Sequence, residues 1–476
     1  MSHSSADTNS AVPLQSAATP PLKGAEVSPL KSLLRTALPA VIDLASQTIM
    51  WTVEAILIGK ISAAAFGGVG MALQVVIVCI TVLLTFIVGS TLIITRHLGA
   101  GEKDEANHIL SQAMILGAVM ACLLAVFWYF GATNIFKLIK GNEGAAAEQA
   151  GVTYLRTLAV FAPFIIMNFI AVGIIRGAGD THYSMLINLG INGLNLILAP
   201  VLIFGLIGVP SLGVRGAALA AGICHTLGFF GTLYLLRSRK SVLFLSFREM
   251  AQPNFQTFKR LFNTGVPTTI EQLVWAFSQL VVTGFVAQLG VEMLASHQVF
   301  LRIQAILSML YIGFGMGAMT LMGKNLGAAN RPLAQHTAEV SSAVMFGTVV
   351  VIGVILWGYA RPIMGLFSND PEVIHFGSFA MLMFALTQVP KAINNVVVGN
   401  LRGAGDLRWL MWMTVIAAFV IEIGLNWVIV FGFLQGALRA NLGLLCVWAV
   451  QLFDETIRFA LYYLRFKGGK WKFLHV

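Results

Sequence analysis

The sequence predicts an all-α integral membrane protein of about twelve transmembrane helices, arranged as two parallel six-helix repeats around a central cleft. Three observations predict this fold: the composition, a series of long apolar segments, and a duplicated pair of motifs. Of the 476 residues, 57% are hydrophobic and 11% are charged, whereas a soluble domain is about 45–50% apolar and about 25% charged. So little charge excludes a soluble enzyme, a nucleic-acid-binding module and a disordered protein.

The apolar segments justify the helices one by one. A helix that crosses the bilayer needs roughly 20 mostly apolar residues. The segments of that length are 36–59, 66–95, 109–132, 152–175, 183–208, 216–237, 265–289, 295–322, 337–359, 375–400, 408–433 and 441–464.

The stretches between these segments indicate the domain organisation. Residues 1–34 are rich in Ser, Ala, Thr and Pro and are expected to form a disordered cytoplasmic tail, because they lack the apolar core of a signal peptide. Residues 35–238 form the first six-helix bundle, and residues 264–476 form the second bundle with a short basic tail. Between them, the basic and aromatic stretch 239–263 is expected to lie along the membrane surface.

The positive charges predict the orientation. Of the 30 Lys and Arg residues, roughly three times as many fall in loops on the side of the N-terminus as on the other side, and such loops are typically cytoplasmic. We therefore expect a multi-pass protein of the inner cell membrane with both termini in the cytoplasm.

Two motifs occur twice at nearly the same separation. The string R-G-A-G-D stands at 176–180 and again at 402–406, and L-G-A stands at 98–100 and at 326–328. Because each half has an even number of spans, both halves enter the membrane in the same direction and form parallel repeats. Such repeats enclose a cleft in which transporters bind their substrates.

Acidic residues inside the apolar segments are the first functional candidates, since charge at membrane depth is costly. We assign cation or proton coupling to Glu54, Glu271 and Asp43. A carboxyl group buried in an apolar environment can take up and release a proton near neutral pH. The alternative is that these groups are hydrogen-bonded contacts between helices.

Polar residues on the same helical faces are candidates for the substrate cavity. Trp275 and Gln279 continue the face of Glu271, and Arg302 or Lys391 is its expected ion-pair partner. Amide side chains must point away from lipid, towards either a cavity or a neighbouring helix. The full cavity set is Gln47, Asn168, Asn188, Asn192, Trp275, Gln279, Arg302, Lys391 and Asn395.

The repeated R-G-A-G-D loops supply Arg176, Asp180, Arg402 and Asp406. Their glycines permit tight reversals between helices, so we expect gating or turn-forming roles at the cytoplasmic surface rather than substrate contacts. Asp454 and Arg458 are spaced as an i, i+4 pair and are expected to be structural.

Together, these motifs resemble the multidrug and toxic compound extrusion (MATE) family. The resemblance covers roughly residues 30–475 and includes the run V-E-A-I-L-I-G at 53–59, P-T-T-I-E at 267–271 and A-S-H-Q at 295–298. It implies a polyspecific efflux antiporter that exports organic cations in exchange for H⁺ or Na⁺ by rocking between two open states.

Two departures from the family's pattern bear on the coupling ion. Leu198-Ala199-Pro200 stands where one branch has L-D-P, and Pro390-Lys391-Ala392 stands where another has P-D-A. Because a lysine replaces the acid associated with sodium binding, H⁺ is favoured over Na⁺. We expect no other cofactor and no bound metal.

Three other functions are alternatives to an antiporter. An intramembrane enzyme is disfavoured because the G-A-G-D strings lie at helix ends and no Tyr-Asp partner string exists. A lipid-linked precursor flippase of the same superfamily would favour a strongly cationic cavity, whereas acids outnumber bases at membrane depth here. A channel fits duplicated halves less well. The sequence thus favours a monomeric secondary transporter whose partners are small organic cations and the lipid bilayer, with no nucleic acid.

Overall fold

The computed structural model of the protein describes residues 28–139, 145–206, 208, 210–433 and 436–474. Within these residues every regular element is helical. The first half comprises α1 (Pro29–Gly59), α2 (Ala63–Ala100), α3 (Lys103–Ile139), α4 (Ala145–Gly177), α5 (Thr181–Phe204) and α6 (Gly213–Arg237).

The second half repeats this pattern after a short helix, α7 (Phe247–Met250). It comprises α8 (Phe255–Ala287), α9 (Val291–Gly327), α10 (Arg331–Gly358), the short α11 (Ala360–Phe367), α12 (Pro371–Gly403), α13 (Leu407–Ile416) and α14 (Gly436–Lys467). Two π-helical segments, η1 (Ala417–Leu425) and η2 (Val428–Phe433), continue α13, and a 3₁₀ turn, η3 (Lys470–Phe473), follows α14.

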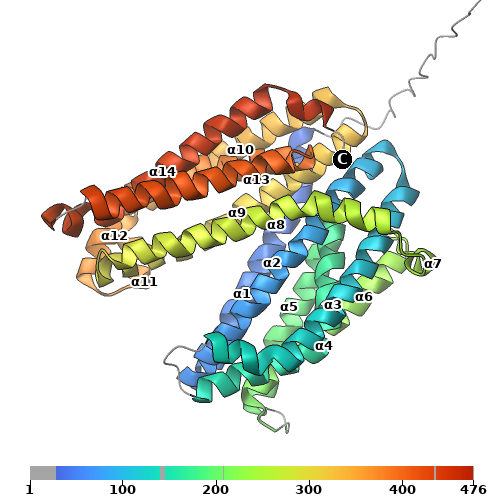
Figure 1. Cartoon of the computed structure of the whole chain (residues 1–476), viewed down its shortest axis with the longest axis horizontal. Coiled ribbons are helices and arrows are strands. Elements are labelled where there is room, and N and C mark those ends of the chain that lie inside the picture. The colour runs from blue at the N-terminus through green and yellow to red at the C-terminus, as the bar shows by residue number, and fades with distance from the viewer. Residues whose placement is uncertain (1–27, 140–144, 207, 209, 434–435, 475–476) are drawn as a thin grey trace, which may run out of the picture.

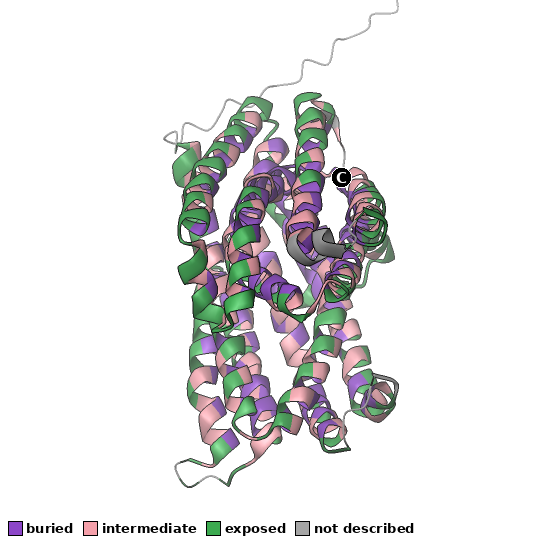
Figure 2. Cartoon of the chain, turned by 90° about the vertical axis from the view of Figure 1, so that its left-hand side faces the viewer, coloured by how far each residue is buried: buried purple, intermediate pink, exposed green. Residues whose placement is uncertain are grey.

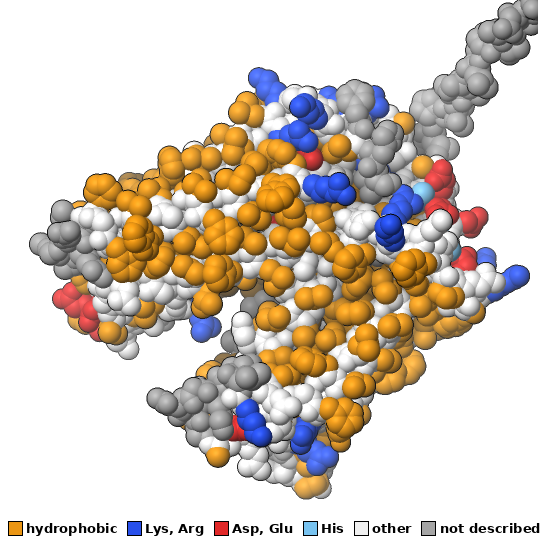
Figure 3. All heavy atoms as spheres, in the orientation of Figure 1, with side chains coloured by type: hydrophobic (Ala, Val, Ile, Leu, Met, Phe, Trp, Pro, Cys, Tyr) orange, Lys and Arg blue, Asp and Glu red, His pale blue; other side chains and the backbone are white. Residues whose placement is uncertain are grey.

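Among the described residues, eleven helices are long and apolar enough to cross a membrane. The predicted twelfth span corresponds to α14, which is 32 residues long but carries the charged residues Asp454, Glu455 and Arg458. Large apolar side chains cover the outer faces of the helices, whereas buried residues face inward (Figures 2 and 3). This distribution suits a molecule surrounded by lipid.

The two halves form two lobes that meet at one end and diverge towards the other (Figure 1). We call these the closed end and the open end. The closed end carries both R-G-A-G-D loops and the last turn of α14. Contacts between the lobes run mainly from α2 to α8 and α9, and from α1 to α9.

Glycines bring the backbones of α2 and α9 together at the closed end. A Cβ atom on Gly99 would lie 2.1 Å from the carbonyl oxygen of Lys324, and one on Gly327 would lie 2.1 Å from that of Arg96. Both glycines belong to the repeated L-G-A motif, so the two repeats meet here almost symmetrically. Arg96 also donates a 2.9 Å hydrogen bond to the carbonyl of Ala404 in the opposite lobe.

Two element boundaries differ from those expected. Helix α1 begins at Pro29, where Ser28 caps it, so only residues 1–27 of the expected tail lie outside the described residues. Helix α8 begins at Phe255 and takes in residues 255–263, which the sequence assigned to the linker. The rest of the linker is docked on α3, because Asn107 and Gln112 accept hydrogen bonds of 2.8 Å from the backbone of Phe244 and Asn254.

Candidate functional site

A cleft of about 670 Å³ lies between the lobes on the side of the open end. Figure 3 shows the molecule hollowed between the free ends of its two lobes. The first lobe contributes one face of α1 and the start of α2, and the second contributes a single side chain, Arg302 of α9. The lining residues are Thr48, Trp51, Thr52, Ala55, Ile56, Gly59, Ala63, Phe66 and Arg302.

Glu54 lies on the face of α1 that is turned away from this cleft. Its side chain is buried inside the first lobe, where the hydroxyl group of Tyr154 on α4 donates a 3.1 Å hydrogen bond to its Oε1 atom. Its neighbours Trp51 and Ala55 line the cleft. One turn of α1 therefore joins a buried carboxyl group to the cleft wall.

Asp43 is also buried, and it has two partners. Asn188 of α5 donates a 2.7 Å hydrogen bond to one carboxyl oxygen, and Arg176 lies 3.3 Å from the other. One helical turn away, Asn192 donates a 2.8 Å hydrogen bond to Ser46. The two asparagines thus connect α5 to α1, and Gln47 is half-buried on α1, one turn after Asp43.

Glu271 pairs with neither Arg302 nor Lys391. Its Oε1 atom accepts a 2.7 Å hydrogen bond from Arg402, the arginine of the second R-G-A-G-D loop. Lys391 stands eleven residues earlier on α12, which is about 16 Å along a helix, so it cannot reach the same carboxyl group. Arg302 is exposed towards the cleft instead.

The two R-G-A-G-D loops therefore have roles that the sequence did not predict. In each lobe the arginine pairs with an acid of the first helix of that repeat: Arg176 with Asp43 and Arg402 with Glu271. The aspartate of each loop holds a neighbouring segment against the end of its own bundle. Asp180 accepts hydrogen bonds from Ser241 and the backbone of Val242 in the linker, and Asp406 forms a 2.7 Å ion pair with Arg465.

Lys391 belongs to a separate charged cluster inside the second lobe. Its ammonium group lies 3.5 Å from Glu455, and Arg458 lies 3.2 Å from both Glu455 and Glu422. Arg458 also contacts Asp454, as the i, i+4 spacing predicted. Glu422 and Glu455 lie in the apolar segments 408–433 and 441–464, but no spacing in the sequence indicated their partners.

The remaining predicted cavity residues are distributed over both lobes. Asn168 accepts a 2.9 Å hydrogen bond from Thr232 inside the first lobe, and Asn395 donates one of 3.0 Å to the carbonyl of Lys391. Gln279 and Lys391 line a small enclosed space in the second lobe, whereas Trp275 is partly exposed. Of the predicted set, only Arg302 lines the cleft itself.

Comparisons with known proteins agree with this architecture. The MatE family model matches residues 39–201 and 267–428, one stretch in each lobe. A probable multidrug resistance protein, NorM of Thermotoga maritima, is 26% identical over 442 residues and covers 92% of each chain. The uncharacterised transporter YisQ of Bacillus subtilis is 25% identical, with 92% of this chain and 94% of that protein covered.

Solved structures share the fold. The outward-facing conformation of a multidrug resistance MATE family transporter of the MOP superfamily superimposes with a TM-score of 0.82 at 20% identity, covering 93% of this chain and 97% of that chain. A MOP superfamily transporter from Pyrococcus furiosus gives 0.83 at 20% identity, with coverages of 94% and 97%.

The two helical lobes and the cleft between them define a membrane transporter rather than an enzyme. Because the family model matches more than half of the chain, in both repeats, the protein belongs to the MATE family of multidrug efflux transporters. The predicted all-helical fold of two repeats is confirmed.

Proposed function

We propose that the protein is a secondary active antiporter that exports amphipathic organic cations in exchange for H⁺ by alternating access. The observation that carries this proposal is the asymmetry between the two ends of the molecule. The lobes touch through backbone at Gly99 and Gly327, while a cleft is open at the other end. Rocking the two lobes against each other, about the contacts of α1 and α2 with α8 and α9, would close the open end and open the closed one.

Orientation in the membrane follows from the positive charges. Both termini and the closed end would face the cytoplasm, where Lys and Arg residues are typically enriched. The cleft would then open to the outside of the inner cell membrane, as a state that releases cargo requires. The protein would act as a monomer, because both lobes and the cleft belong to one chain.

Glu54 is the proposed site of proton exchange. It is buried and has a hydroxyl donor in Tyr154, and the adjoining turn of its helix lines the cleft. Binding of a cation beside α1 would favour the ionised carboxylate, and protonation would favour release of the cation. A ligand that binds only one protonation state couples the two events.

The surroundings of the carboxyl groups favour H⁺ over Na⁺. A hard metal cation needs several oxygen ligands, whereas Glu54 has one side-chain hydroxyl as its hydrogen-bond partner. In the second lobe, Lys391 and Arg458 already neutralise much of the acidic cluster. Asp43 and Glu271 have arginine partners, so a coupling role for them requires these pairs to open.

The direct test uses proteoliposomes with one gradient at a time. Tetraphenylphosphonium or ethidium flux is measured under a pH gradient without sodium, and then under a sodium gradient at uniform pH. The proposal expects flux under the pH gradient alone. Flux driven only by sodium would overturn the proton assignment. If neither these dyes nor a wider panel of organic cations is transported, the proposed cargo class is wrong.

One observation favours a second candidate, a flippase for anionic lipid-linked precursors. Arg302 is the one charged side chain that lines the cleft among the described residues, and arginine binds phosphate groups well. A fluorescent polyprenyl pyrophosphate in the same liposomes tests this. The flippase would replace the antiporter proposal if this lipid is translocated, if Arg302→Gln abolishes its translocation, and if organic cations are not transported.

A further inference from the structure

The second lobe contains another cavity, on its outer flank and separate from the cleft. It measures about 340 Å³ and lies between α10, α12 and α14. Eight of its lining side chains are apolar or aromatic, including the small Ala338 and Ala343, and three are polar. The larger apolar and aromatic side chains are Phe346, Ile393, Val397, Phe459, Tyr463 and Phe466, and the polar ones are Glu339, Ser342 and Asn400.

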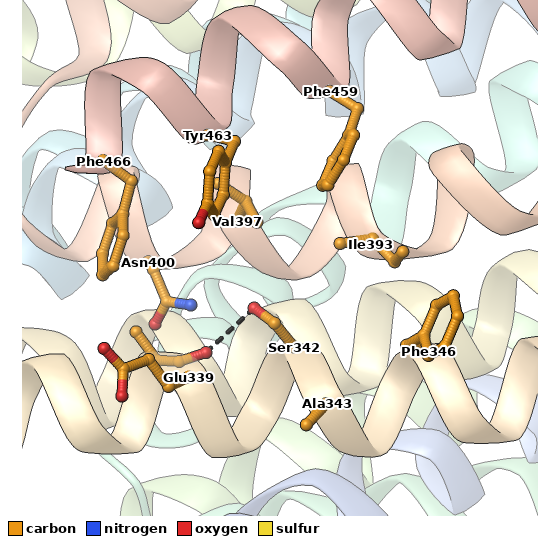
Figure 4. Close-up of a pocket in the computed structure, with 11 residues that line it drawn as sticks. Glu339, Ser342, Ala343, Phe346, Ile393, Val397, Asn400, Phe459, Tyr463 and Phe466 are labelled. Atoms are coloured by element: carbon orange, nitrogen blue, oxygen red, sulfur yellow. Dashed lines mark hydrogen bonds between the residues drawn. The ribbon is translucent and has the colours of Figure 1, made fainter.

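Two of the polar groups, Glu339 and Asn400, lie at one end of this flank cavity, with Ser342 nearer its middle (Figure 4). Glu339, Asn400 and Phe466 lie together at one end, whereas Phe346, Ile393 and Phe459 lie at the other. Glu339 is two turns into α10 and Asn400 is one turn from the end of α12, so the polar end is near the closed end of the molecule. The cavity therefore runs from the charged edge of the bundle towards membrane depth.

Asn400 offers an unused hydrogen-bond acceptor. Its side chain is 1% exposed, and its Oδ1 atom has no hydrogen-bond partner among the described residues. Its amide nitrogen is occupied by Ser341, at 3.4 Å. A buried acceptor without a donor costs free energy, and a ligand with an N–H group would relieve that cost.

Glu339 supplies a negative charge at the same end. It takes part in no ion pair within the described part of the chain, and its one hydrogen bond comes from Gln335, at 2.9 Å. The amide oxygen of Gln335 is held by Lys472, at 2.7 Å, so the amide NH₂ group faces Glu339. One carboxylate oxygen is thereby left for a donor from outside the protein.

We propose that this flank cavity binds an amphipathic amine, with a primary or secondary ammonium group between Glu339 and Asn400 and an apolar body against the aromatic side chains. A carboxylate and an orphaned amide oxygen are both acceptors, so they select a cation that carries N–H donors. Aromatic rings attract a cation at the polar end and bury the body beyond it. A cavity of this size suits a small drug-like molecule.

The ligand reaches this site from the membrane. Phe346 and Tyr463 are 52% and 51% exposed, respectively, and other large apolar side chains of the same helices, such as Val351 on α10 and Leu464 on α14, are exposed as well. An amphipathic amine already orients its charged group towards the bilayer surface and its body towards the hydrocarbon. The site therefore stands apart from the cleft and does not depend on the proposed antiport.

The test uses a photoreactive probe. Protein in phosphatidylcholine nanodiscs is labelled with a diazirine-bearing alkylamine, and modified peptides are mapped by mass spectrometry. We expect labelling on α10 and α14 that an excess of dodecylamine suppresses. Dodecanol lacks the charge and dodecyltrimethylammonium lacks the N–H donors. Each should therefore compete about tenfold more weakly than dodecylamine, or weaker still.

Two variants address the two ends of the cavity. Glu339→Gln should weaken labelling about tenfold by removing a charge-assisted hydrogen bond, and Ala343→Phe should abolish it by filling the cavity, which Ala343 lines. Glu105→Gln, an exposed acid on the corresponding helix of the first lobe, is the matched control and should label like the parent protein. Size-exclusion profiles confirm that each variant is folded.

Three results would overturn the proposal. Equal competition by the alcohol or the quaternary amine would mean that the cavity is only an apolar slot. Unchanged labelling in both Glu339→Gln and Ala343→Phe would place the amine elsewhere. Loss of labelling when phosphatidylethanolamine replaces phosphatidylcholine would make a lipid headgroup the occupant. Labelling needs no ion gradient, so its result does not depend on whether the antiport assay succeeds.

Discussion

Glu271 on α8 and Arg402 at the end of α12 form a 2.7 Å ion pair that has a counterpart in the other lobe, where Asp43 on α1 pairs with Arg176 at the end of α4. In both lobes an acid of the first helix of the repeat meets the arginine of the R-G-A-G-D loop. The duplicated motif therefore preserves a duplicated charge pair. Both pairs are largely buried, so breaking either one leaves a charge without a partner.

The Glu271–Arg402 pair should show strong energetic coupling. Removing one partner, as in Glu271→Gln, is expected to lower the free energy of unfolding by about 3 kcal/mol, because Arg402 stays partly buried without its carboxylate. The charge swap Glu271→Arg with Arg402→Glu should recover part of this loss. Denaturation of each purified variant, the two single substitutions and the double one, measures these free energies of unfolding. Strictly additive effects would show that the two side chains act independently.

The glycine contacts at the closed end should control the position of the lobes. Gly99→Ala would place a Cβ atom 2.1 Å from the backbone of Lys324, so the closed end must open. The reactivity of Ala55→Cys in the cleft towards an impermeant thiol reagent should fall about tenfold as the population shifts. Gly190→Ala, with nothing within 4 Å of its Cβ, is the control and should not change the reactivity.

The charged cluster of the second lobe should be essential for stability. Arg458→Met would leave Glu422, Asp454 and Glu455 with only Lys391 to offset their charge. We expect a loss of about 3–5 kcal/mol and a clearly lower Tm in detergent. Arg361→Met removes an exposed arginine from α11 and should leave the Tm unchanged, and equal Tm values for both variants would contradict the structural role of the cluster.

Glu54 should be needed for coupled transport but not for folding. Glu54→Gln keeps the size of the side chain and can still accept a hydrogen bond from Tyr154, so the Tm should change little. Dye flux driven by a pH gradient should fall at least about a hundredfold, because no exchangeable proton remains there. Tyr154→Phe should reduce the flux less, and full flux in Glu54→Gln would remove this residue from the mechanism.

Much of the fold was predictable because membrane helices must satisfy their own backbone and expose apolar side chains. Apolar stretches locate α1 to α6 and their counterparts, and the repeated motifs reveal the parallel repeats. The i, i+4 pair of Asp454 and Arg458 was predictable for a similar reason, since it depends on one helix alone.

The long-range contacts were not predictable in the same way. Arg402 reaches Glu271 across the lobe, and no local spacing indicates which buried cation an acid will meet. One signal was present, because Asp43 and Glu271 occupy corresponding positions in the two repeats, as do Arg176 and Arg402. The burial of Glu54 behind the cleft wall depends on how α1 packs within the first lobe and on Tyr154 reaching it from α4, which the sequence pattern leaves open.

Proton release on cargo binding tests the central claim most directly. Tetraphenylphosphonium is added to purified protein in weakly buffered detergent solution near neutral pH, and the protons released are measured with a pH indicator for the parent protein and for Glu54→Gln. The account predicts release from the parent protein and a marked loss of release in the variant, with both still binding the cation. Equal release from both proteins, or cation binding to the parent without any release, would contradict it.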